Sequence, residues 1–121
     1  MAPTALAGVN TGSGDPRQTV YSFYNLVGQH RFSEAALLWS ESMRAQFPPS
    51  TQINDRFRDT QQIQVVQATV LNRNDAAGVA TVAVTLVEQK AGASPQGYRL
   101  YGTWQLVRGS SGWLLNHPNF G

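Results

Sequence analysis

The sequence predicts an α+β domain in which two or three N-terminal helices pack on a curved, four-stranded antiparallel sheet to form a cone. Apolar residues recur with the helical period of about 3.6 in the first half of the chain, and with the strand period of about 2 from Gln61 onward. Turn-forming residues separate the later segments, as is typical of consecutive hairpins. A chain of 121 residues is long enough to bury one core.

The pair Asp15-Pro16 predicts the start of the first helix. Asp is a preferred N-cap, and Pro is favoured at the first helical position because its missing N–H is not needed there. Val20, Phe23 and Val27 then recur at helical spacing and form one apolar face.

Two shorter helices are expected next. We expect one over residues 34–42, capped by Ser33. The prolines at 48–49 then break the chain, and Ser50 or Thr51 can cap a third helix that ends near Arg58.

Four strands are expected to follow as a meander. They are predicted over residues 61–71, 79–88, 98–108 and 113–117. Strict alternation in the first strand places Ile63, Val65, Gln67, Thr69 and Leu71 on one face. Gly102, inside the third strand, is the expected position of a bulge or bend.

The composition argues against several classes of protein. The net charge is +2, with basic residues spread singly, which favours a solvated surface over nucleic-acid binding. Apolar runs are far shorter than a membrane span requires, so we expect no membrane insertion. The chain has no Cys, and His30 and His117 stand far apart without paired carboxylates, so we expect no metal site and no cofactor.

The first fourteen residues differ in character from the rest. Residues 1–14 are rich in Ala, Gly, Ser and Thr and lack the basic and apolar regions of a signal peptide. We expect them to be a flexible leader or linker remnant, and residues 15–121 to form the domain.

Two stretches carry a resemblance to a known family. They are residues 20–39, with their helical aromatic pattern, and residues 102–115, which read Gly-Thr-Trp-Gln-Leu-Val and then Trp-Leu-Leu. Over residues 15–120 the chain resembles the nuclear-transport-factor-like superfamily, also called ketosteroid-isomerase-like or SnoaL-like. The resemblance implies a cone whose bent sheet wraps the first helix. It is strongest to extracytoplasmic domains of bacterial envelope proteins, which suggests a location outside the cytoplasm.

Isomerases of that superfamily are expected to carry an acidic base after the second helix, and this chain departs from the pattern. Residues 42–49 contain no carboxylate. The remaining candidate bases are Glu88, Asp55, Asp59 and Glu41, of which Asp59 or Glu88 could work with Tyr24. Glu88 stands at a strand end, where a solvated carboxylate is the ordinary interpretation.

A run of alternating charges surrounds one aromatic residue, Phe57. The segment 55–59 reads Asp-Arg-Phe-Arg-Asp, which predicts a cluster of salt bridges on a helix surface. The alternative is that a guanidinium of this segment meets an acidic ligand at the mouth of the cone.

Aromatic residues are the main candidates for a binding site. Most should fill the core, because a small domain needs large side chains there. Those that could instead line a cavity for a small apolar ligand are Tyr24, Trp39, Phe57, Tyr101 and Trp104. The sequence therefore favours a non-catalytic module that binds a small molecule or a protein. The alternative is a cofactor-independent isomerase, dehydratase or hydrolase that uses Tyr24 with Asp59 or Glu88.

The sheet has apolar side chains on both of its faces, and the helices can cover only one. Because the charged fraction of the chain is only 13%, the other face is expected to be poorly solvated. We therefore expect a homodimer that forms through the outer face of the sheet.

Overall fold

Helices and strands follow one another in the order that the sequence predicts. The computed structural model describes residues 14–92, 97–110 and 112–120. The helical elements are α1 (Pro16–Gly28), α2 (Phe32–Ala36), α3 (Glu41–Gln46) and the π-helical turn η1 (Ser50–Asp55). The strands are β1 (Thr60–Asn74), β2 (Val79–Lys90), β3 (Tyr98–Gly109) and β4 (Gly112–Phe120).

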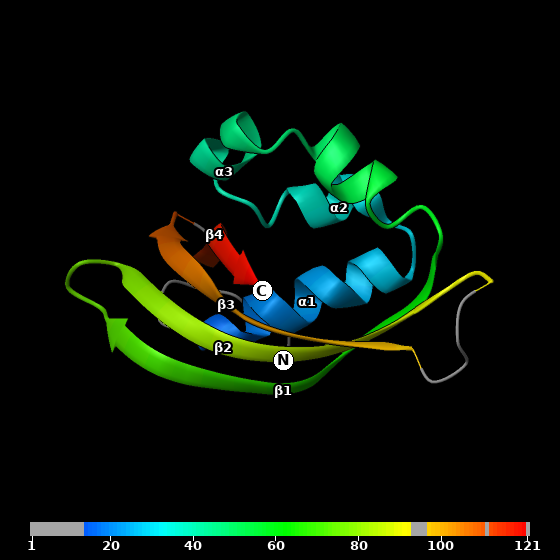
Figure 1. Cartoon of the computed structure of the whole chain (residues 1–121). Coiled ribbons are helices and arrows are strands. Elements are labelled where there is room, and N and C mark those ends of the chain that lie inside the picture. Colours follow the sequence, from blue (N-terminus) through cyan, green and yellow to red (C-terminus); the bar gives the residue numbers. More distant parts are fainter. Residues whose placement is uncertain (1–13, 93–96, 111, 121) are drawn as a thin grey trace, which may run out of the picture.

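The strands form one antiparallel sheet with the order β1-β2-β3-β4. Figure 1 shows that this sheet is strongly curved and that the helices lie on its concave side. The α+β arrangement is therefore confirmed, and it fits the cone that the family resemblance implies.

The first helix begins where the sequence predicts. The Asp15 carboxylate accepts a hydrogen bond from the backbone N–H of Arg17 (2.9 Å), and Pro16 occupies the first turn. Val20 and Val27 are fully buried, because α1 presses its apolar face into the hollow of the sheet. This helix contributes side chains to the candidate site described below.

The expected second helix, residues 34–42, is instead divided into α2 and α3. The division lies at Trp39, which forms an isolated bridge with Leu115 of β4. The next N–H, that of Ser40, donates to the Leu115 carbonyl (2.9 Å), and the Ser40 hydroxyl then caps α3 at Met43. At this break the backbone forms hydrogen bonds with β4 of the sheet in place of helical hydrogen bonds. No local sequence pattern predicts this exchange.

Two of the three register shifts between β1 and β2 change which side chains point inward beyond Val65. The pairing with β2 shifts between Val65 and Gln67 and again between Val70 and Asn72. Each extra residue moves the following side chains to the opposite face. As a result Ala68 is buried and Leu71 is 57% exposed, whereas strict alternation predicted that Leu71 would share the face of Ile63.

The pairing of β3 has no register shift at Gly102, the expected position of a bulge, and the irregularity in its pairing with β4 adds a residue, Asn116, to β4 rather than to β3. The register of β3 against β4 shifts between Gln105 and Leu106. Gly102 serves a different purpose, because a Cβ at this position would lie 2.5 Å from ring carbons of Phe120. The missing side chain lets that ring lie over the strand.

Candidate functional site

A pocket of about 320 Å³ lies between the helices and the concave side of the sheet. Its wall is mainly aromatic and apolar, and two polar residues, Gln52 and Arg56, contribute to it. The aromatic residues that line it are Phe23, Tyr24, Trp39, Phe47, Phe57, Trp104 and Phe120. A mostly apolar hollow with a few polar groups is the usual form of a small-molecule site.

Four of the five residues that the sequence proposed for a cavity are brought together here. Tyr24, Trp39, Phe57 and Trp104 all line the pocket, although they come from four separate segments of the chain. Whether they hold a ligand stays a prediction. Their convergence follows from the fold, because α1 and the segment between α2 and α3 both face β3 across the hollow.

The placement of the fifth residue, Tyr101, in this cavity is wrong. Tyr101 is 58% exposed and pairs with Thr85 on the convex face of the sheet. Side chains alternate along a strand, so two residues separated by three positions point to opposite faces. Because Trp104 points inward, Tyr101 must point outward.

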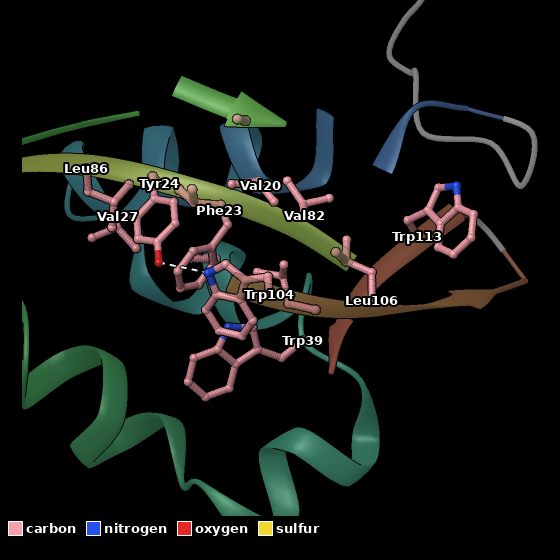
Figure 2. Packing of buried hydrophobic residues seen from close by; sticks show 14 of the residues in the cluster. Val20, Phe23, Tyr24, Val27, Trp39, Val82, Leu86, Trp104, Leu106 and Trp113 are labelled. Carbon is pink, nitrogen blue, oxygen red and sulfur yellow. Dashed lines mark hydrogen bonds between the residues drawn. The ribbon is translucent and has the colours of Figure 1, made fainter. Parts of the chain in front are cut away.

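The Tyr24 hydroxyl is held by a hydrogen bond inside the aromatic wall. It accepts from the indole N–H of Trp104 at 2.9 Å. Figure 2 shows this bond as a dashed line, and Phe23 contacts both rings, with centroid separations of 4.9 Å and 6.1 Å. Burial raises the pKa of Tyr24 far above its ordinary value. The phenol therefore stays protonated and can donate a hydrogen bond, but it is a poor base.

Glu88 is not the solvated carboxylate that its position at a strand end suggested. Its side chain is only 1% exposed and lies behind Arg56. Two hydrogen bonds of 2.8 Å and 2.9 Å join the Arg56 guanidinium to the two carboxylate oxygens. The Thr60 hydroxyl donates to Oε2 as well. A bidentate ion pair between the buried Glu88 and the partly exposed Arg56 thus stabilises the polar part of the pocket wall.

The electrostatics of this pair fix its charge state. Burial alone would raise the pKa of Glu88, but the hydrogen bonds from Arg56 and Thr60 outweigh it and hold that pKa below its usual value. The Arg56 guanidinium, which also lies over the Phe57 ring at 4.5 Å, stays charged. The two charges cancel, so this part of the wall carries no net charge.

The two arginines of the charged segment 55–59 therefore have different kinds of partner. Arg58 pairs with Asp55 at the surface, as the helix-surface interpretation predicted. Arg56 instead reaches across to β2, which that interpretation missed. A signal for Glu88 was present in the sequence, because alternation along β2 places it on the same inward face as Val84 and Leu86.

The remaining candidates do not converge on the pocket. Asp59 is exposed. His30 Nε2 lies 2.6 Å from the Thr60 carbonyl oxygen, so it serves a backbone contact. Within residues 14–92, 97–110 and 112–120, no group of three or more His, Asp or Glu side chains could hold a metal ion. In the same part of the chain, no helix has the length and apolar character needed to cross a membrane.

Comparison with known proteins gives a likeness in fold only. No model of a known protein family matches this chain, and no curated protein matches it. Among solved structures, it is similar to a protein from Xanthomonas campestris pv. campestris described as a "putative polyketide cyclase". The two share 14% sequence identity over 84% of this chain and 89% of the other, with a TM-score of 0.49. At that identity, the likeness says nothing about the activity of this chain.

Proposed function

We propose that this chain is a non-catalytic module that binds a small, mostly apolar molecule in the pocket between its helices and its sheet. The observation that carries this proposal is the pocket itself, which combines a volume of about 320 Å³ with an aromatic wall. Ligand pockets in proteins range from about 300 to 1,000 Å³. The volume therefore suits a compact molecule such as a fused pair of aromatic rings.

The state of the two candidate catalytic groups favours binding over catalysis. A general base must be free to accept a proton, and its pKa works best near the operating pH. The Glu88 carboxylate is instead held by Arg56 and Thr60 with a lowered pKa, and Tyr24 is held as a neutral phenol. An isomerase, dehydratase or hydrolase that used Tyr24 with Glu88 would first have to break this ion pair.

Binding can be tested with prodan, a neutral naphthyl ketone whose emission shifts to the blue in apolar surroundings. We expect the wild-type chain to bind it with a blue shift. Leu100→Trp, which adds an indole to the pocket wall, should lower the affinity by about tenfold or more, because the ring takes up a large share of the volume.

The matched control is Tyr101→Trp, which adds an indole to the neighbouring residue on the convex face. It should leave prodan binding unchanged. If the wild-type chain gave no blue shift, or if both variants lowered the affinity equally, the pocket would not be the binding site.

We also propose a homodimer that forms through the convex face of the sheet. No described element covers this face (Figure 1). The outward-facing positions of β2 and β3 are mostly Thr, Ala, Val and Gln, with the exposed Tyr101 among them, and only Arg99 is charged. A second copy placed face to face would remove this weakly solvated surface from water, and a stable pair needs about 1,200 to 2,000 Å² of buried area.

Sedimentation at micromolar concentration tests the dimer. We expect twice the chain mass of 13.2 kDa for the wild type, and the mass of one chain for Tyr101→Lys, which places a charge in the middle of the face. Leu37→Lys, at a 65% exposed site between α2 and α3, is the control and should stay dimeric. A wild type that sediments as a single chain would contradict the proposal.

A further inference from the structure

One of the three tryptophans leaves a buried hydrogen-bond donor unused. Trp39 is 3% exposed, and its Nε1 is the only buried side-chain nitrogen or oxygen without a hydrogen-bond partner in the described part of the chain. Trp104 donates to Tyr24, and Trp113 donates to the Gly14 carbonyl, each at 2.9 Å. Buried polar groups in native proteins nearly always have a partner, so an unused donor needs an explanation.

Trp39 cannot relieve this deficit by turning toward solvent, because its backbone is tied to the sheet on both sides. The Leu115 N–H donates to the Leu38 carbonyl (2.8 Å), and the Ser40 N–H donates to the Leu115 carbonyl (2.9 Å). The Ser40 hydroxyl also donates to the Asn116 side chain. Phe23 stacks on the indole at a centroid separation of 5.8 Å. The donor is therefore held in place before any ligand arrives.

The surroundings limit what could accept this hydrogen bond. Most residues that line the pocket with Trp39 are apolar, and Gln52 and Arg56 are the polar ones besides Tyr24 and Trp104, which bond to each other. A buried water usually needs two to four polar partners, and the mostly apolar wall of this pocket offers few. An acceptor atom on an otherwise apolar ligand would satisfy the donor without that requirement.

The charge of the ligand follows from the ion pair. Among the residues that the structure describes, Arg56 is the one charged residue that lines the pocket, and Glu88 neutralises it through two hydrogen bonds. An anionic ligand would have to leave water for a wall without net charge, which is unfavourable. The pocket therefore suits an uncharged molecule.

We infer that the Trp39 indole N–H selects the ligand of this pocket, which is an uncharged aromatic or alicyclic molecule that presents a carbonyl or ether oxygen to it. This inference rests on the proposed binding function and adds the chemical class of the ligand. It makes Trp39 the residue that distinguishes an oxygen-bearing ligand from a hydrocarbon of the same shape.

Three naphthalene probes test the inference on the intact chain: methyl naphthyl ketone, its isopropenyl analogue, in which a CH₂ replaces the oxygen, and naphthoate. Calorimetry should show that the ketone binds about tenfold more tightly than the isopropenyl analogue, the difference expected for one buried hydrogen bond. It should also bind more tightly than naphthoate. Trp39→Phe keeps an aromatic ring but removes the N–H, so within this variant the ratio of the two affinities should fall from about ten to about one, whatever the smaller ring does to the absolute affinities.

A second measurement does not depend on the variant. In ¹⁵N-labelled wild-type protein, the indole N–H signal of Trp39 should move downfield with the ketone and stay in place with the isopropenyl analogue. The indole signal of Trp113, which already donates to the Gly14 carbonyl and does not line the pocket, serves as the internal reference.

The possible outcomes separate this inference from the proposed function. If both neutral probes bind equally and the Trp39 signal does not move, Trp39 does not select the ligand, although the pocket still binds small molecules. If naphthoate binds most tightly, the uncharged class is wrong. If no probe binds, the binding function fails and this inference fails with it.

Discussion

Replacement of Arg56 by Ala is expected to lower the free energy of unfolding at neutral pH by about 3 kcal/mol. The reason is that Glu88 is only 1% exposed, so the variant leaves a buried carboxylate without its counter-ion. Urea unfolding at pH 7 gives the measurement. Arg58→Ala, which breaks the exposed pair with Asp55 in the same segment, is the control and should cost less than about 1 kcal/mol.

The cost of Arg56→Ala should depend on pH in a defined direction. In the wild type the pKa of Glu88 is lowered, so its contribution to stability is present above the ordinary value of 4.5 and is lost as the pH falls through the lowered pKa. Without Arg56, burial dominates and raises that pKa, so the variant loses stability as the pH rises above the ordinary value. The difference between the two proteins should therefore shrink from pH 7 toward pH 4. An equal cost at both pH values would contradict the role given to the ion pair.

Trp104→Ala is expected to destabilise the chain by about 3 to 5 kcal/mol, the usual loss for a buried large aromatic side chain. Trp104 is 3% exposed and contacts rings from both the helices and β4, namely Phe23 and Phe120. Its removal opens a cavity and takes the indole N–H away from Tyr24. Chemical unfolding measures the loss.

Tyr101→Ala is the matched control, because it removes a large aromatic residue from the opposite face of the same strand. At 58% exposure it should cost less than about 1 kcal/mol in the isolated chain. A similar cost for the two variants would mean that the concave side is not the main core of the domain.

Local patterns in the sequence determined the fold class and much of the core. The Asp15-Pro16 cap and the period of α1 depend only on neighbouring residues, so the first helix was predicted correctly at its start. The order of strands followed from turn residues between them. Four of the five proposed pocket residues were found because a cone needs aromatic volume on its inner side. The location outside the cytoplasm stays a prediction.

The tertiary structure alone decided what depends on partners distant in the chain. Trp39 is pinned because a strand more than seventy residues later supplies its hydrogen-bonding neighbour, Leu115, and this contact also divides the expected second helix. Leu71 faces solvent because bulges in β1 change the register against β2. Arg56 and Glu88 form a pair only because the fold brings the residue that follows η1 next to β2. Sequence periodicity reports which face of one element is apolar, whereas these features depend on where two elements meet, and that is set by the packing of the whole domain.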